Sequence, residues 1–224
     1  MALPATRPLR RRDLIRFDLT TGLWVSIRQL AAHLGARRLV QVAWGLARRT
    51  GQDPLHGQQT PAWAETAEPL VRHQLRPALQ LDEVLADDLG LSVEERVPIL
   101  RAVIAETGAA FVATHAKGVS PRAWARATVP ARQGWAEGLI ARFFNARIEG
   151  VETTETTIRF QVSACRFASL VVALDRPHLA PLFCAADSVF FERPGTPATL
   201  TRHGTLAQGA PACDFLLALK PPEP

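Results

Sequence analysis

A change of pattern near Gly150 constrains the fold more than any other feature of the sequence. Before it, apolar residues recur every three or four positions, which is the spacing of one face of a helix. After it, residues 151–165 (VETTETTIRFQVSAC) are rich in threonine, and apolar and polar side chains alternate as they do in a strand. The sequence therefore predicts an α+β protein. We expect a mostly helical region, residues 1–150, packed on a small antiparallel sheet with helices, residues 151–224, in one compact domain.

The clearest helix start in the first region is the segment SVEER. Ser92 and Glu95 match a capping box, in which the hydroxyl and the carboxylate each accept a backbone N–H. Pro98 predicts an irregular first turn, because proline lacks the N–H that a helix needs. Gly118 and Pro121 are expected to end this helix. The other helices are expected over residues 12–35, 37–49, 62–86 (broken or kinked by Pro69 and Pro77) and 131–147.

Strands and short helices alternate in the second region. Ile158, Phe160 and Val162 share one face of the first strand, whereas Cys165 lies on the opposite, polar face. Helices are expected over residues 166–174 and 179–192, and further strands over 198–203 and 212–219.

The composition fits a globular protein outside the membrane. Apolar residues make up 47% of the chain and charged residues 21%, which suffices for a core. No uninterrupted apolar run reaches the roughly 18 residues of a membrane span. The basic N-terminal segment is interrupted by Arg16, Asp18 and Arg28, which makes a poor signal peptide. We therefore expect a cytoplasmic protein with no membrane partner.

The excess of basic over acidic residues is a feature that proteins binding nucleic acid often share. The formal net charge is +5, but the arginines are scattered and only residues 7–16 are dense. A solvated surface with a mobile basic arm explains this pattern, so nucleic acid is not the expected partner. An interaction protein that uses this arm on nucleic acid remains the third hypothesis, and it predicts steeply salt-dependent binding.

Three cysteines suggest chemistry rather than disulfides. An odd number is unlike a secreted disulfide scaffold, and free thiols are either buried or reactive. Cys184 and Asp187 are three positions apart on an expected helix and share a face. Cys213 and Asp214 are neighbours on a strand and point to opposite faces. If the strands pair and the helix covers them, these thiols and Cys165 could meet.

Such a cluster would need a nucleophile, acid–base groups and a means of holding the substrate. A thiolate is a nucleophile. Acid–base groups must protonate the leaving group and activate water. Arginine can bind a substrate carboxylate through a forked pair of hydrogen bonds. The local acid–base candidates are Asp187, Asp214, His178 and His203, and the substrate-binding candidates are Arg202, Arg166, His203 and His178.

Zinc binding is the competing interpretation. Cys165, Cys184 and Cys213 could bind zinc together with an aspartate or histidine. Structural zinc sites usually contain a C-x-x-C pair, and this sequence has none. A zinc- or ligand-binding module therefore stays as the alternative to a metal-free enzyme.

Residues 160–219 resemble the C-terminal signature of the L-2-amino-thiazoline-4-carboxylic acid hydrolase family. That signature has a strand that ends in cysteine, a second cysteine with an aspartate three positions on, a T-L-A-x-G-A segment after an arginine, and a final C-D-F. The sequence departs from it at His203, where threonine is expected, and at Leu216, where a basic residue is common. The matching residues are Cys165, Phe167, Pro177, Leu179, Cys184, Asp187, Arg202, Thr205, Leu206, Ala207, Gly209, Ala210, Cys213, Asp214 and Phe215.

The resemblance implies a bacterial biosynthetic or catabolic hydrolase that opens a cyclic C=N bond in a small carboxylated substrate, without a cofactor. Cys184 or Cys213 would supply the thiolate, and Asp187 or Asp214 would be its acid–base partner. Cys165 would form a third wall of the pocket. Attack by water oriented by the aspartates stays open, as does a homo-oligomer.

Overall fold

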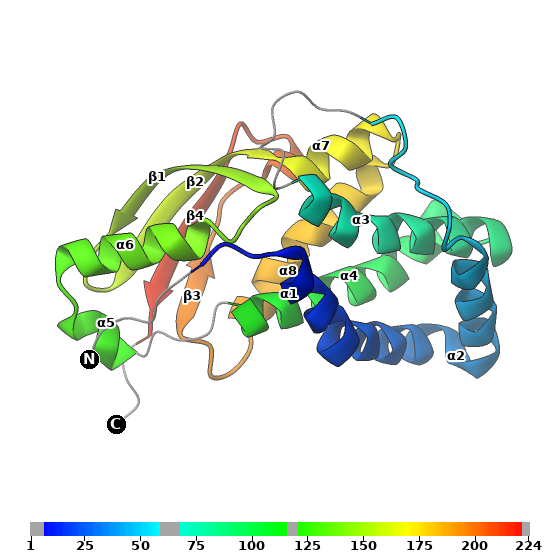
Figure 1. The fold of residues 1–224 in the computed structure, drawn as a ribbon, viewed down its shortest axis with the longest axis horizontal. Helices are drawn as coiled ribbons and strands as arrows, with labels where there is room; N and C mark the ends of the chain where they lie inside the picture. The colour runs from blue at the N-terminus through cyan, green and yellow to red at the C-terminus, as the bar shows by residue number, and fades with distance from the viewer. Residues whose placement is uncertain (1–6, 59–67, 116–120, 221–224) are drawn as a thin grey trace.

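The computed structural model describes residues 7–58, 68–115 and 121–220, and it combines a layer of helices with one antiparallel sheet (Figure 1). This confirms the expected α+β class. The first region contains α1 (Arg11–Phe17), the π-helical turn η1 (Asp18–Gly22), α2 (Leu23–Arg48), α3 (Glu68–Glu83), the π-helical turn η2 (Val84–Asp88), α4 (Val93–His115), α5 (Pro121–Arg126) and α6 (Val129–Ile140). The second contains β1 (Ala146–Thr153), β2 (Thr157–Cys165), α7 (Arg166–Ala173), η3 (Pro177–Leu179), α8 (Ala180–Phe191), β3 (Ala198–Thr201), η4 (Leu206–Gln208) and β4 (Cys213–Leu219).

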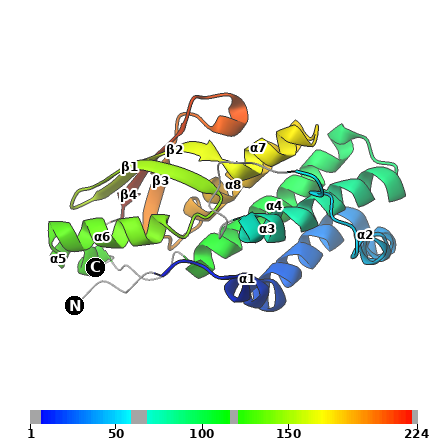
Figure 2. The same ribbon diagram turned by 45° about the horizontal axis from the view of Figure 1, so that its top comes forward.

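The sheet has the strand order β1-β2-β4-β3, and each neighbouring pair is antiparallel. The alternation in β2 is confirmed, because Ile158, Phe160 and Val162 are buried while Arg159 and Gln161 are exposed. The buried face packs under α5 and α6, which lie along one side of the sheet in Figure 2. The sheet therefore has one buried face and one solvent-exposed face, as antiparallel sheets commonly do.

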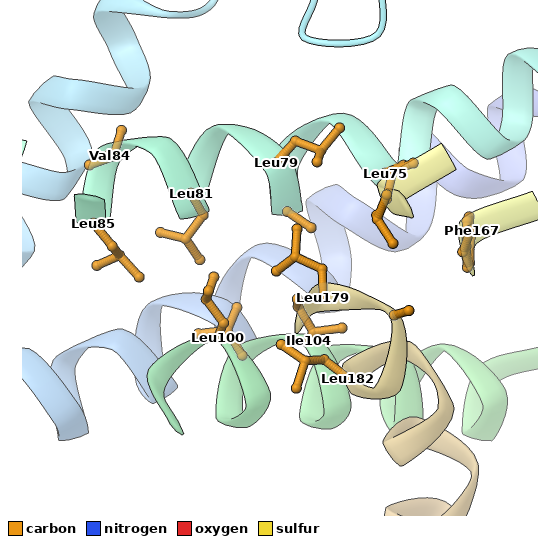
Figure 3. Close-up of a cluster of buried hydrophobic side chains, with 14 of the residues drawn as sticks. Leu75, Leu79, Leu81, Val84, Leu85, Leu100, Ile104, Phe167, Leu179 and Leu182 are labelled. Carbon is orange, nitrogen blue, oxygen red and sulfur yellow. The ribbon is translucent and has the colours of Figure 1, made fainter. Parts of the chain in front are cut away.

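A second core lies within the helical layer. Leucines of α3 and η2 fill the space above α4 and the start of α8, and Phe167 of α7 closes one end (Figure 3). α4 and α8 approach closely because position 108 has no side chain. A Cβ atom on Gly108 would lie 2.5 Å from the Cβ atom of Ala186. The packing of α8 against α4 fixes where the residues of α8 stand relative to the sheet.

Several predicted boundaries are confirmed. The backbone N–H of Ser92 donates to Glu95 Oε2 at 2.8 Å, and the N–H of Glu95 donates to Ser92 Oγ at 3.3 Å, which is the expected capping box. The predicted break after residue 35 is a kink inside α2, where Gly35 has φ 71°. Glycine adopts this left-handed conformation without the steric cost of a Cβ atom. α7, α8, β3 and β4 begin within one residue of their predicted starts.

Other predictions are wrong. α4 runs through Pro98 without a break, and α3 runs through Pro77. The helix predicted to continue to residue 147 ends at Ile140, and Ala146 already begins β1. Residues 151–165 form parts of two strands rather than one. Residue 150, which divides the two regions named above, lies within β1, but the division itself stays a prediction. The predicted helix end at Gly118 and residues 62–67 lie outside the described residues.

The hairpin turn explains why one predicted strand is two. The hydroxyl of Thr154 accepts the backbone N–H groups of Thr156 and Thr157, at 3.2 and 2.9 Å. A threonine side chain thereby forms the turn without the glycine or proline that usually marks one.

α4 is long and apolar enough to cross a membrane, although no uninterrupted apolar run in the sequence indicated such a helix. Within the described residues it is the one helix with the length and composition to cross a membrane, with a mean hydropathy of 1.4 over its best window. In the structure it packs against both α8 and α2.

Candidate active site

Cys184 and Asp187 lie one helical turn apart on α8, and Arg202 reaches both from the segment after β3. Arg202 Nη1 donates to Asp187 Oδ2 at 3.1 Å, and Nη2 donates to the backbone carbonyl of Cys184 at 3.0 Å. The guanidinium also lies over the ring of Phe215, 5.1 Å from its centre. Cation–π contact and two hydrogen bonds hold this arginine in one orientation.

Burial sets the protonation of Asp187. It raises the pKa of this carboxyl from 3.8 to about 6, and the nearby charge of Arg202 offsets part of the rise. A carboxyl of this kind is protonated in part of the molecules near neutral pH. It can therefore donate a proton to a leaving group, which the more acidic carboxyls of the surface cannot do as readily.

Cys165 is placed at the start of a helix. It is the last residue of β2 and the residue that precedes α7, where the backbone N–H groups of Phe167 and Ala168 partly offset the rise in its pKa. The side-chain amide of Asn145 lies 3.9 Å from the sulfur. These three donors favour the thiolate, although burial raises the pKa of the thiol overall. The half-buried thiol thus has partners for a negative charge that it would develop during a reaction.

Cys213 opens β4 on the buried face of the sheet, opposite Val162 on β2. It is 4% exposed, and its sulfur accepts the backbone N–H of Leu206 at 3.2 Å. Burial raises its pKa. Of the three thiols, this one is the least accessible to a substrate.

The three thiols lie close enough to act on one another electrostatically. Burial raises the pKa of Cys184 to about 12, and negative charge on Cys165 or Cys213 raises it further. The positive charge of Arg202 lowers the pKa of Cys184 and Cys213. The charges of the other two thiols, of Asp187 and of Arg202 therefore all act on Cys184.

Metal-site geometry is absent from this cluster. No three side chains of His, Cys, Asp or Glu come together to hold a metal ion anywhere in residues 7–58, 68–115 and 121–220. The zinc alternative gains no support from the arrangement of the thiols.

Asp214 and His203 form a turn rather than part of the thiol cluster. Asp214 accepts the backbone N–H groups of His203 and Gly204 at 2.9 and 3.0 Å, and it lies 2.7 Å from His203 Nδ1. These bonds lower its pKa to about 2. The Asp214 side chain lies on the sheet face opposite that of Cys213, as the strand alternation predicts, and the His203 side chain is 81% exposed.

Arg166 and His178, two predicted substrate-binding residues, already have partners. Arg166 is 1% exposed and donates to Glu68 of α3. His178 Nε2 lies 3.2 Å from Asp82, whose carboxylate also binds Arg96 at 2.6 Å. Both side chains connect the C-terminal region to α3, which is a structural task.

The site also contains residues that sequence reasoning missed. Asn145 and Phe215 contact Cys165 and Arg202, and Glu68 holds the residue after Cys165. Phe215 belongs to the C-D-F signature, so a role for its ring could have been suggested. No signal in the sequence points to Asn145 or Glu68.

A separate polar hollow of about 590 Å³ lies at the C-terminal end of α2. Its ionic side chains bind one another, with Arg49 to Asp88 at 2.7 Å and Arg176 to Glu83 at 2.9 Å. It contains no thiol, and its charges are mutually neutralised. The hollow is lined by Arg48, Arg49, Gln52, Glu83, Asp87, Asp88 and Arg176.

Comparison with known proteins bears on this site. The family model described as L-2-amino-thiazoline-4-carboxylic acid hydrolase matches residues 85–217, more than half of the chain. All three cysteines, Asp187 and Arg202 lie within the matched range. Searches of curated proteins and of solved structures gave no match.

Proposed function

Because the chain belongs to the L-2-amino-thiazoline-4-carboxylic acid hydrolase family, we propose that it opens the ring of a small carboxylated heterocycle by attack at the carbon of its C=N bond. The site would comprise Cys165, Cys184, Asp187 and Arg202. The observation that carries this proposal is the ion pair of a partly buried guanidinium, Arg202, with a carboxyl of raised pKa, Asp187, near thiols whose charges act on one another.

We assign the nucleophile to Cys165 rather than to Cys184 or Cys213. The amide of Asn145 lies near its sulfur, the backbone N–H groups at the start of α7 lower its pKa in part, and it is half-buried rather than closed off. Burial raises the pKa of Cys184 to about 12, and Cys213 is the most buried of the three thiols. Those two thiols would form walls of the pocket.

The reaction proceeds through an enzyme-bound isothiourea. The sulfur of Cys165 attacks the carbon between the ring sulfur and nitrogen, and the basic ring nitrogen takes the thiol proton. The tetrahedral adduct then breaks its C–S ring bond, and the departing sulfur takes a proton from Asp187. Water adds to the isothiourea carbon and returns a proton to Asp187. The Cys165 sulfur then leaves with the second proton of that water, which regenerates the thiol and leaves a carbamoylated amino group. Overall, one water is added and no electrons are gained or lost.

Arg202 would link the binding of substrate to the protonation of Asp187. It forms an ion pair with Asp187 in the free site. A substrate carboxylate that binds this guanidinium would weaken its hold on Asp187, and the pKa of Asp187 would rise further. Substrate binding would thus keep the proton on Asp187 until the ring sulfur leaves.

The decisive experiment incubates the protein with 2-amino-thiazoline-4-carboxylate and follows N-carbamoyl-cysteine by mass spectrometry. Cys165→Ser should lower kcat at least about a thousandfold, whereas Cys213→Ser should retain most of it. Rapid quenching should show a protein adduct heavier by the mass of the intact substrate, because ring opening releases no fragment. Turnover without an adduct, and with an active Cys165→Ser variant, would assign the attack to water instead.

A second measurement tests the absence of a cofactor. We expect elemental analysis of active protein to find no stoichiometric metal. A bound metal that disappears in the cysteine variants would contradict the thiolate mechanism and favour the zinc-binding module.

A further inference from the structure

Large apolar side chains are exposed along one segment of the chain. Six of the nine that are exposed in the described part of the chain lie between residues 15 and 44, while Val93, Val129 and Val172 are isolated. Trp24 and Trp44 are 68% and 65% exposed. Isolated exposed apolar residues are ordinary, but a concentration of them marks an interaction surface. We call this the outer face, and its members are Ile15, Leu19, Leu23, Trp24, Val40 and Trp44.

The outer face spans α1, η1 and the two parts of α2 that the kink at Gly35 separates, and each part of α2 also has a residue buried in the core. Leu30 and Val42 of α2 are buried in the helical core. Val40 and Trp44 are four positions apart, so they share a face, and Ala43 and Ala47 continue it. α1 and α2 lie along the edge of the molecule in both ribbon views (Figures 1 and 2).

This segment is also strongly cationic. Residues 7–48 contain nine arginines and only two acidic residues, although the whole chain has a net charge of just +5. The two aspartates are paired, Asp13 with Arg7 at 2.7 Å and Asp18 with His73 at 2.7 Å. Arg48 lies 3.3 Å from Asp88, and the other arginines, which flank the apolar residues and are exposed, are Arg10, Arg11, Arg12, Arg16, Arg28, Arg37 and Arg38.

We propose that the outer face binds the surface of an anionic lipid bilayer. Helices that lie in a membrane interface combine tryptophan and leucine on one side with arginine beside them, and the apolar side chains enter the headgroup region while the cations meet anionic lipids. Such helices need no long apolar run, so the expectation of no membrane partner, which rested on run length, does not bear on them. The proposal does not depend on the hydrolase reaction.

Two other occupants explain the surface less well. A second copy of the chain would bring two arginine-rich segments together, and like charges facing each other oppose association. Nucleic acid would use the arginines, but it offers no partner to the aliphatic side chains of Leu19, Leu23 and Val40. A bilayer interface accounts for both the apolar and the cationic residues.

The test is co-sedimentation of the full protein with vesicles of equal parts phosphatidylglycerol and phosphatidylcholine, compared with vesicles of phosphatidylcholine alone. We expect binding to the anionic vesicles that weakens with added salt. Trp24→Ala and Trp44→Ala together should lower the partition coefficient about tenfold. Arg37→Gln and Arg38→Gln should lower it about fivefold each. Val172→Ala and Arg159→Gln, exposed residues outside the segment, are the matched controls and should change nothing.

Circular dichroism confirms that each variant is folded before it is compared. A folded protein that ignores anionic vesicles overturns the proposal, as does binding that the controls weaken as much as the tryptophan variants do. Light scattering that shows a dimer, lost in Trp44→Ala, would assign the face to self-association instead. Salt-sensitive binding to duplex DNA without vesicle binding would assign it to nucleic acid.

Discussion

Arg166 binds Glu68 through two hydrogen bonds, Nε to Oε2 at 2.9 Å and Nη2 to Oε1 at 2.8 Å, across 98 positions of sequence. The pair ties the first residue of α3 to the first residue of α7. Arg166 follows Cys165 directly, so the contact helps to fix the helix start on which that thiol depends. Glu68 lies before the range that the family model matches. Part of the support of the site therefore comes from the segment that precedes it.

Loss of this carboxylate should destabilise the fold. The Arg166 side chain is 2% exposed, and Glu68→Gln would leave its charge buried with a weaker partner. We expect the free energy of unfolding to fall by about 3 kcal/mol, as when one member of a buried pair is removed. Urea denaturation measures it. Glu155→Gln, at an exposed turn, is the control and should cost less than about 0.5 kcal/mol.

A double variant shows whether the loss of stability comes from the unpaired charge of Arg166 or from any substitution at these positions. Glu68→Leu with Arg166→Met should recover much of the loss, because it removes both charges. If this variant is no more stable than Glu68→Gln, the buried charge is not the cause.

The alkylation rate of Cys184 should rise with pH over an unusually wide range. Burial raises its pKa to about 12, and only the thiolate reacts with iodoacetamide. We therefore expect about a tenfold increase per pH unit from pH 7 to pH 10 with no plateau. Mass spectrometry of the peptide that contains Cys184 measures it. The same peptide in urea should reach a plateau near pH 9, and a plateau there in the folded protein would contradict the raised pKa.

The free energy of unfolding should depend on pH because of the raised pKa of Asp187. Its folded pKa of about 6 exceeds the ordinary 3.8, so the folded state holds a proton that the unfolded state releases. The resulting stabilisation, about 3 kcal/mol, is fully present below pH 3.8 and is lost as the pH rises to about 6. The difference in unfolding free energy between wild type and Asp187→Asn should therefore fall between pH 4 and 6 and stay level above. Parallel pH curves for the two proteins would show that the pKa is not raised.

Asp187 and Asp214 should respond oppositely to substitution. Asp214→Ala removes the acceptor of two backbone N–H groups and should lower the free energy of unfolding by about 1–2 kcal/mol, with kcat within a few-fold of wild type. Asp187→Ala should instead lower kcat by about a hundredfold or more, because it removes the proposed acid. Steady-state kinetics and urea denaturation on the same preparations distinguish the two. A catalytic loss confined to Asp214→Ala would reverse the assignment.

The elements around the site were predictable where local signals are strong. α7 and α8 were predicted to within one residue at both ends, because each is a short apolar segment bounded by a change of pattern. β1 was missed because Phe143 and Phe144 continue the helical spacing of apolar residues past the end of α6. The continuity of α4 through Pro98 shows tertiary packing overriding a local preference.

Site residues were predictable only within the motif that contains them. The shared face of Cys184 and Asp187 follows from helix geometry, and Arg202 follows from the resemblance. The partners of Arg166 and His178 are almost a hundred positions away, on α3. No spacing rule connects such residues, because only the packed fold brings them together. Asp214 was grouped with the acid–base candidates, and in the structure it accepts the backbone N–H groups of His203 and Gly204 in a turn.

The contact between Gly108 and Ala186 makes α8 sensitive to a position far from the chemistry. Because residue 108 has only a hydrogen atom as its side chain, the helix that carries Cys184 and Asp187 can pack closely against α4. Any bulkier residue there would act as a wedge and lift both side chains together, altering their alignment with Arg202 while leaving every reacting group intact. Among homologues, the residues at positions 108 and 186 should therefore vary together, with a larger side chain at one position only where the other position has a smaller one.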